Sequence, residues 1–585
     1  MTQHSPPDRP HEDLPDKGRQ HRDHPDLRSR SWFGAEGKTG FVHRSKLYNT
    51  GRSAAMFDGR PVIGIANSWS ELTPCNGHLR HLAEDVKRGV LLAGGFPLEF
   101  PTISLGETLM RPSAMLYRNL MAIDVEESLR AHPLDGVVLL AGCDKTVPAQ
   151  LMGALSVDLP TIMLTGGPML NGKFRGRDAG SGTHVWRFSE DLRAGRMSRA
   201  EFGAAEACLS RSSGHCTTMG TASTMACLVE VMGLSLPGSA AVPAVDAGRA
   251  ALAEQSGRRI VEMVDEDLRP SRIIDRRSFD NAARLNAAIG GSTNAIVHLS
   301  ALAGRAEVEF PLSAFDEQAT DIPLLVNLLP SGQFLMEEFC YAGGVPAVVQ
   351  ELGGLLDGGT GTVAGTTNWD PAVIHPVHDP VQPAGNATAV VRGSLAPDGA
   401  VIKLSAASAE FAEHVGPALV FDRVEDYYAV CEDPDLDVTP EIVLVVRESG
   451  PRGYPGMPEI GNLAIPKKLL DRGITDMVRI TDGRMSGTSY GTVVLHIAPE
   501  SAAGGPLALV RNGDPIHLNV ARRRLDLLVD PDELRRRRAD SRPAPSPDPG
   551  GWSRLYRNHV QQADAGADLD FLRGRRGHAV PRRNL

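Results

Sequence analysis

DGVVLLAGC (135–143) and LPTIMLTGG (159–167), with RPVIGIANSW (60–69) before them, are the apolar runs that decide the fold of this chain. Each run ends in a glycine-rich or polar turn, and segments with helical spacing lie between the runs. Continuous Val, Ile and Leu runs of this length are typical of parallel strands that helices cover on both faces. We therefore predict an α/β domain with a parallel sheet, whose ligand site lies at the carboxyl ends of the strands.

Three of the seven cysteines lie where this predicted sheet would place a site. Cys143 ends the run at 135–143, Cys75 lies several residues past the run at 60–69, and Cys216 lies in SGHCTTMGTASTMA (213–226). They are 68 and 73 residues apart, unlike the local C-x₂-C spacing of zinc ribbons and bacterial ferredoxins. This spacing suits an iron–sulfur cluster assembled from three separate loops. One iron would then lack a protein thiolate and could act as a Lewis acid.

The other four cysteines lie in helical or apolar surroundings, and we predict structural roles for them: Cys208, Cys227, Cys340 and Cys431. An odd number of cysteines in a long chain without a secretion signal argues against a disulfide framework.

Carboxylates and a lysine lie close to these cysteines or in rigid loops elsewhere. In AGCDKTVPAQ (141–150), Asp144 and Lys145 are compatible with a salt bridge at the sheet edge or with a metal site. In a metal site, Asp144 would bind a hard cation such as Mg²⁺, and a carbamate formed from Lys145 and CO₂ would add an oxygen ligand. Glu107 in LGETLMRPSAM (105–115) and Glu459 at the end of PRGYPGMPE (451–459) offer further carboxylates.

The segment ITDGRMSGTSYG (480–491) presents Ser486 in a tight turn after a predicted strand. This is compatible with an ordinary turn serine, or with a nucleophile or base that is held near a cation.

Composition limits the class of protein. The formal net charge of −10 argues against nucleic acid as the main partner, because phosphate binding needs a basic face. No stretch approaches the roughly 20 apolar residues of a membrane span, and no signal peptide is recognisable, so we expect a cytoplasmic protein. The polar residues 1–30 are predicted to be a disordered tail.

The pattern of the chain changes at PVHDPVQPAG (376–385), a proline-rich junction. Residues 31–378 are assigned to the α/β domain that holds the cluster, and within it Gly290 and Gly291 interrupt the helical pattern of 281–302. Residues 385–575 are assigned to a C-terminal β-barrel domain of the swivelling type. Its predicted strands are ATAVVRGSL, GAVIKLS, PALVF, EIVLVVR, MVRITD, GTVVLHI, PLALVRNGD and PIHLNV.

Together these motifs resemble the dihydroxy-acid and sugar-acid dehydratase family over about residues 48–572. The motifs are PCNGH (74–78), GCDK (142–145), CTTMGTASTMA (216–226), GGSTNA (290–295), MEEFCYAGG (336–344), GYPGMPE (453–459) and DGRMSG (482–487). The resemblance implies a [2Fe–2S] cluster, with [4Fe–4S] assigned in some members, held by Cys75, Cys143 and Cys216. It also implies Mg²⁺ held by four side chains, with Ser486 as the base; these are Glu107, Asp144, carbamylated Lys145 and Glu459. Family members are α/β plus β-barrel proteins that form homodimers or homotetramers, with the site between the domains.

Within the family, GCDKTVPA and SLGETLMRPSAMLYRNLM (104–121) are similar to the pentonate (arabinonate or xylonate) dehydratases. The branched-chain amino-acid enzymes typically carry GCDKNMPG in place of GCDKTVPA. The expected reaction is the conversion of a sugar acid to its 2-keto-3-deoxy acid, with dihydroxy-acid dehydration as the alternative. Ser486 would remove the C2 proton, and the open iron would assist departure of the C3 hydroxyl. LYRNHVQQADAGADLDFL (555–572) also resembles this branch, and His559 in it is a candidate substrate contact.

Two other classes of function fit less well. An iron–sulfur sensor would use the three cysteines but would not need Glu107, Asp144, Glu459 and Ser486. A nucleotide-dependent transferase would need a phosphate loop, and the near match GPMLNGKF (167–174) has Phe174 where a Ser or Thr should reach Mg²⁺.

Overall fold

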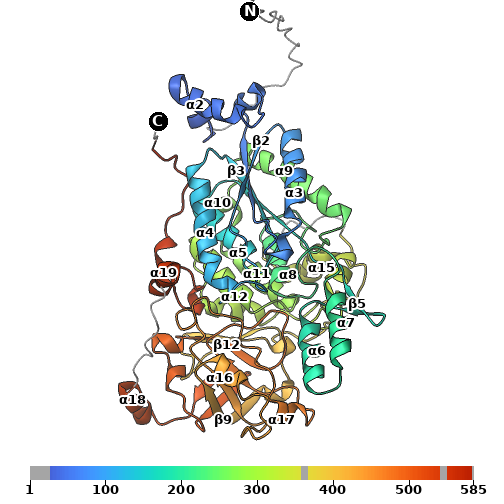
Figure 1. Ribbon diagram of the computed structural model, residues 1–585, viewed down its shortest axis with the longest axis vertical. Coiled ribbons are helices and arrows are strands. Elements are labelled where there is room, and N and C mark those ends of the chain that lie inside the picture. The colour runs from blue at the N-terminus through green and yellow to red at the C-terminus, as the bar shows by residue number, and fades with distance from the viewer. Residues whose placement is uncertain (1–26, 358–365, 541–549, 583–585) are drawn as a thin grey trace, which may run out of the picture.

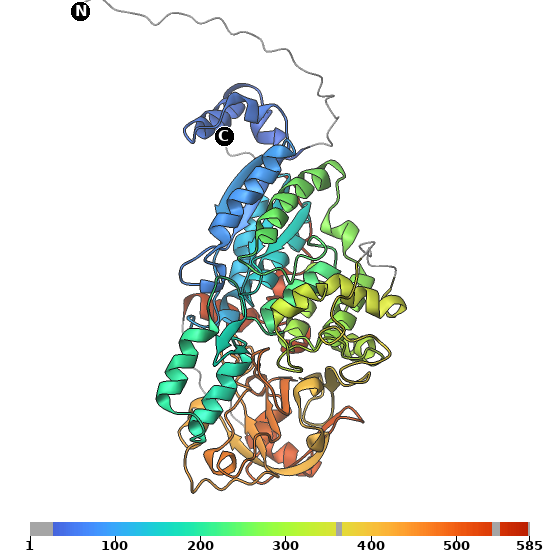
Figure 2. The same ribbon diagram turned by 90° about the vertical axis from the view of Figure 1, so that its right-hand side faces the viewer.

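The computed structural model describes residues 27–357, 366–540 and 550–582. The N-terminal half of the chain, blue to green in Figure 1, forms the upper part of the molecule, and the C-terminal strands lie below it. Figure 2 shows the same division from the side.

A four-stranded parallel sheet organises the N-terminal domain, in the order β2-β1-β3-β4. Its strands are β1 (Val62–Asn67), β2 (Phe96–Pro101), β3 (Gly136–Ala141) and β4 (Thr161–Thr165). The three predicted strands are confirmed, whereas β2 was missed. The last four residues of β2 (FPLEFP) are partly or fully exposed and include Glu99, so this edge strand lacks the continuous apolar run of the others.

Helices cover both faces of this sheet. On one face Ile65, Val138 and Leu164 pack with α3 (Leu79–Leu92) and α9 (Ala247–Asp265). On the other, Val137 and Leu139 pack with α4 (Ala114–Ala131) and α5 (Thr146–Val157). Because successive residues of a strand point to opposite faces, two-sided burial requires the unbroken apolar runs seen in the sequence.

The remaining elements of the N-terminal half surround this sandwich. They are α1 (Arg30–Phe33), α2 (Gly37–Tyr48), β5 (Gly172–Phe174), β6 (Arg177–Ala179), α6 (Thr183–Arg193), α7 (Arg199–Leu209), α8 (Thr221–Val231), α10 (Pro270–Ile273), α11 (Arg276–Ala288), α12 (Asn294–Arg305), α13 (Leu312–Ala319), α14 (Met336–Tyr341) and α15 (Gly344–Leu352). The predicted break in the helical pattern separates α11 from α12, where Gly290 has φ +60°.

The C-terminal domain is an eight-stranded mixed sheet in the order β14-β13-β9-β10-β11-β12-β8-β7. The strands are β7 (Ala389–Val391), β8 (Gly399–Ile402), β9 (Glu413–Phe421), β10 (Val443–Val446), β11 (Arg479–Thr481), β12 (Val493–Ala498), β13 (Pro515–Asn519) and β14 (Arg524–Leu527). Its helices are α16 (Val424–Tyr428), α17 (Lys467–Leu470), α18 (Pro531–Asp540) and α19 (Gly551–His559). An isolated bridge between Arg392 and Arg524 joins the two edges, so the sheet approaches a closed barrel.

Two strand assignments in this domain differ from the prediction. PLALVRNGD (506–514) is not a strand, because Pro506–Leu509 form a 3₁₀ helix and a turn follows. Pro506 stands at the start of that helix, where a missing N–H costs nothing. RLDL, which forms β14, was missed because charged residues alternate with its two leucines.

Both ends of the chain return to the N-terminal domain. Of the predicted tail, residues 1–26 lie outside the described residues, but Leu27 and Arg28 are buried, so the folded chain begins before residue 31. After α19, the segment around Asp568 is buried against the N-terminal domain, where Asp568 forms an ion pair with Arg305 of α12. Across the described ranges, no helix combines the length and apolarity needed to cross a membrane.

Candidate active site

The three predicted cluster cysteines come together at the carboxyl ends of β1 and β3. Cys75 lies in a short 3₁₀ helix (Pro74–Asn76) after β1, and Cys143 lies two residues after β3. Cys216 arrives from the loop before α8. A hydrogen bond to Cys143 raises the pKa of the Cys75 thiol well above its usual value, and burial and the charge of Cys216 act in the same direction.

Burial raises the pKa of Cys216 to about 12, and the nearby Asp144 and Cys143 add to this effect. Cys75 and Cys216, whose pKa values are raised in this way, cannot serve as thiolates without a positive partner. Metal ions provide that partner, because a coordinating thiol loses its proton outright. The donor set therefore fits an iron–sulfur cluster with three protein thiolates.

The predicted oxygen ligands converge on the fully buried Lys145. Its Nζ lies 3.2 Å from Glu107 Oε2, 3.6 Å from Asp144 Oδ2 and 3.1 Å from Glu459 Oε1. Burial by itself would lower the pKa of Lys145, but the three carboxylates outweigh it, and the pKa is raised. The ammonium thus neutralises carboxylates from distant parts of the chain, since Lys145 and Glu459 are 314 residues apart in sequence.

These groups fit a divalent cation by their chemistry, because three carboxylates around one buried lysine are hard oxygen donors. Within the described ranges, no three His, Cys, Asp or Glu side chains already stand in the geometry of a metal site. The Lys145 ammonium lies among the carboxylates and holds them by ion pairs, so a cation would have to replace its charge. Conversion of the amine to a carbamate would remove that charge and add two oxygen ligands.

Two residues that the sequence gave no role complete this cluster. Arg484, in the DGRMSG motif, is fully buried and its Nη1 lies 2.7 Å from Glu459 Oε1. Asn294 Nδ2 donates to the same oxygen at 2.7 Å and to Thr221 Oγ1 at 3.1 Å. Glu459 has a lowered pKa although burial alone would raise it, because the charges of Lys145 and Arg484 prevail. Arg484 lies in DGRMSG and Asn294 lies in GGSTNA, so the family motifs could have indicated a role for both residues.

The turn that carries Ser486 is seated on the N-terminus of α8. A Cβ on Gly487 would lie 2.7 Å from the backbone N of Thr221 and 2.6 Å from Ser292 Oγ, so only glycine allows this approach. The positive end of a helix dipole favours a nearby anion. The backbone therefore places the Ser486 turn at the positive end of α8.

Thr488 supports Ser486 from within the same turn. Its Oγ1 lies 2.9 Å from Ser486 Oγ, and Thr183 Oγ1 donates to its backbone carbonyl at 2.8 Å. The turn is thus linked to Glu459 through Arg484 on one side and to α6 through Thr183 on the other.

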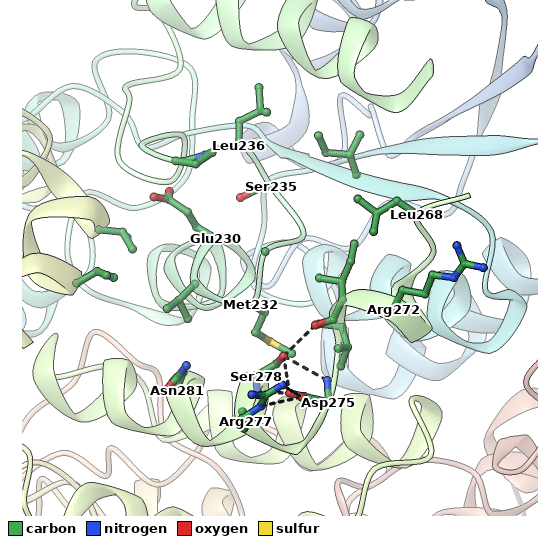
Figure 3. Close-up of a pocket in the computed structure, with 18 of the residues that line it drawn as sticks. Glu230, Met232, Ser235, Leu236, Leu268, Arg272, Asp275, Arg277, Ser278 and Asn281 are labelled. Atoms are coloured by element: carbon green, nitrogen blue, oxygen red, sulfur yellow. Dashed lines mark hydrogen bonds and ion pairs between the residues drawn. The ribbon is translucent and has the colours of Figure 1, made fainter. Parts of the chain in front are cut away.

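Other candidates lie apart from this site. His559 contacts Asp570 at 3.0 Å, within the C-terminal segment. Cys227 and Cys431 are buried in apolar clusters, consistent with the structural role predicted for them. A cavity of about 560 Å³ near the amino end of β4 contains none of the predicted ligands. Figure 3 shows Ser278 and Arg277 of its lining paired with Asp275.

Comparison with known proteins places this geometry in a family. Residues 60–370 match the N-terminal model and residues 372–567 match the C-terminal model of the dihydroxy-acid/6-phosphogluconate dehydratases. The chain belongs to this family. It is therefore a hydro-lyase, and the predicted family is confirmed.

Among relatives, an L-arabinonate dehydratase from Rhizobium leguminosarum bv. trifolii is 54% identical over 564 residues, which cover 95% of this chain and 97% of that protein. An L-arabonate dehydratase from Azospirillum brasilense is 55% identical over 575 residues, covering 95% and 98%. A dihydroxy-acid dehydratase from Ignicoccus hospitalis is 40% identical over 529 residues, covering 88% and 95%. These matches confirm the resemblance of this dehydratase to the pentonate branch.

Proposed function

We propose that this enzyme removes water from a pentonate such as arabinonate or xylonate and releases the 2-keto-3-deoxy acid. One observation carries the proposal: three thiols, three carboxylates around Lys145 and the Ser486 turn converge between the two domains. The relatives named for arabinonate, at 54% and 55% identity against 40% for the dihydroxy-acid enzyme, favour a sugar acid as substrate.

Two cofactors are part of the proposal. Cys75, Cys143 and Cys216 would hold a [2Fe–2S] cluster, or a [4Fe–4S] cluster as in some members of the family. Glu107, Asp144, Glu459 and a carbamate on Lys145 would hold Mg²⁺. When bound, the two groups supply Lewis acidity toward the carboxylate and hydroxyl oxygens of the substrate.

Side chains of the protein then have separate roles in the elimination. Ser486, as the alkoxide, accepts the C2 proton, and the N-terminus of α8 and the Thr488 hydroxyl stabilise its charge. The electron pair of the C2–H bond forms the C2–C3 double bond as the C3 hydroxyl leaves. The proton held by Ser486 balances the leaving hydroxide as water, and the resulting enol tautomerises to the 2-keto acid. Lys145 and Arg484 are fully buried and the Glu459 side chain is 10% exposed, which limits the access of water and strengthens each charge interaction.

A substrate panel tests this proposal. Anaerobically purified, iron-reconstituted protein with Mg²⁺ is assayed for 2-keto acid formation from pentonates, hexonates and 2,3-dihydroxyisovalerate. Turnover of a pentonate with little turnover of dihydroxyisovalerate is expected. The reverse preference would assign the enzyme to dihydroxy acids and overturn the proposed substrate.

The role of Ser486 has a separate test. Ser486→Ala is expected to abolish turnover while the visible absorption of the cluster stays intact. A fully active alanine variant would remove Ser486 from the mechanism without changing the substrate assignment.

A further inference from the structure

Helix α6 belongs to the N-terminal domain in sequence but lies beside the C-terminal strands, as both ribbon views show (Figures 1 and 2). One face of the helix contacts the segment that follows Ser486. Thr183 Oγ1 donates to the Thr488 carbonyl at 2.8 Å, and Trp186 Nε1 lies 3.1 Å from Thr488 Oγ1. One turn further along, Glu190 Oε2 accepts from the Tyr490 hydroxyl at 2.6 Å.

These contacts follow helical spacing and fix the Ser486 turn from outside the barrel. Thr183, Trp186 and Glu190 are three and four residues apart, so they share one face of the helix. The approach is close at its start, because a Cβ on Gly182 would lie 2.6 Å from Thr488 Cγ2, and Gly182 has φ +102°. Thr183 therefore holds the Thr488 backbone, and Trp186 meets its side chain.

The direction of the hydrogen bonds at Thr488 follows from the donors. An indole N–H can only donate, so Thr488 Oγ1 accepts from Trp186. The single hydroxyl proton of Thr488 is then directed away from the indole, and its nearest partner is Ser486 Oγ at 2.9 Å. A donor aimed at Ser486 Oγ stabilises the alkoxide more than the neutral hydroxyl, because hydrogen bonds to a charged acceptor are the stronger ones.

We propose that Trp186 is a positioning residue for catalysis: through its indole N–H it orients the Thr488 hydroxyl toward the Ser486 base. The inference rests on the proposed role of Ser486 and adds to it a residue on a separate element, 300 positions away in sequence. The indole N–H of Trp186 donates to Thr488 and not to Ser486 itself, so Trp186 acts through Thr488.

Trp186→Phe tests the proposal because it removes the N–H and keeps an aromatic ring against the turn. Loss of one oriented hydrogen bond corresponds to a fall in kcat of about 3- to 10-fold, with KM for the preferred pentonate within about twofold of the native value. The deuterium isotope effect on kcat with substrate labelled at C2 is expected to increase, because proton removal becomes slower. Thr488→Val, which deletes the hydroxyl, is expected to lower kcat further.

Trp552→Phe is the matched control. Trp552 Nε1 donates to the Leu116 carbonyl at 3.0 Å, so this variant loses one comparable indole hydrogen bond away from the Ser486 turn. It should keep the native kcat and isotope effect. All variants are compared as cluster-loaded holoenzymes with matched visible absorption.

An unchanged kcat and isotope effect in Trp186→Phe would overturn the proposal. Equal losses in the Trp186 and Trp552 variants, or a Trp186→Phe enzyme that no longer retains the cluster, would also overturn it, since the role would then be structural. An active Ser486→Ala enzyme would instead overturn the proposed base. If Trp186→Phe has native kinetics and Ser486→Ala is inactive, the proposed function stands and the positioning role of Trp186 is refuted.

Discussion

Lys403→Met is expected to stabilise the protein and to remove part of its dependence on pH. Lys403 follows β8, is 2% exposed, and its Nζ has no hydrogen-bond partner among the described residues. Burial lowers the pKa of Lys403 from 10.5 to about 7. Because the unfolded chain holds this proton up to higher pH, the stability of the folded state rises as the pH increases from about 7 to 10.5.

The magnitude follows from the two pKa values. At about 1.4 kcal/mol per pH unit, the charged lysine costs at most about 5 kcal/mol well below pH 7, and this cost falls by roughly 2 kcal/mol between pH 7 and pH 9. Methionine has a similar length and no charge, so the variant should gain most at low pH and nothing above about pH 10.5.

Denaturant unfolding at pH 7 and pH 9 measures this difference for the native protein and the variant. The native protein should gain more stability on going to pH 9 than Lys403→Met does. The exposed Lys46 of α2 provides a control, since Lys46→Met should leave the native pH dependence unchanged. Parallel pH dependences for native protein and Lys403→Met would refute the reasoning, because they would mean that Lys403 titrates alike in both states.

Three further substitutions test individual contacts. Asn294→Ala should weaken Mg²⁺ binding about 10- to 100-fold, measured by calorimetry on cluster-loaded protein, because a hydrogen bond that orients Glu459 is lost. Asp568→Asn should destabilise the protein by about 1–3 kcal/mol in denaturant unfolding, because the buried Arg305 would lose one of its two carboxylate partners and keep only Glu126. Gly487→Ala should lower kcat about 100-fold, since the Cβ displaces the turn; native kinetics with an intact cluster would contradict the contact.

Local patterns were sufficient for three of the four strands of the main sheet and for most of the candidate site residues. The apolar runs predicted β1, β3 and β4 because burial on both faces leaves no polar position in a strand. The position of Cys143 at a strand end placed it at the edge where ligands bind. Strand β14 was missed, and the 3₁₀ helix at Pro506–Leu509 was wrongly predicted as a strand. Both stretches are short, and their sequences are ambiguous without the neighbouring segments.

The sequence by itself determined the parallel sheet, the family and the identity of the groups that meet, because these depend on residue types and on periodicities within a few positions. Only the tertiary structure decided how the groups are supported. Asn294 and Glu459 are 165 residues apart, and Trp186 and Thr488 are 302 apart. Neither contact can be predicted from a sequence pattern, because contacts between distant segments depend on how whole elements pack. The same holds for Lys403: nothing in its local sequence distinguishes it from other lysines, and only burial in the folded protein lowers its pKa.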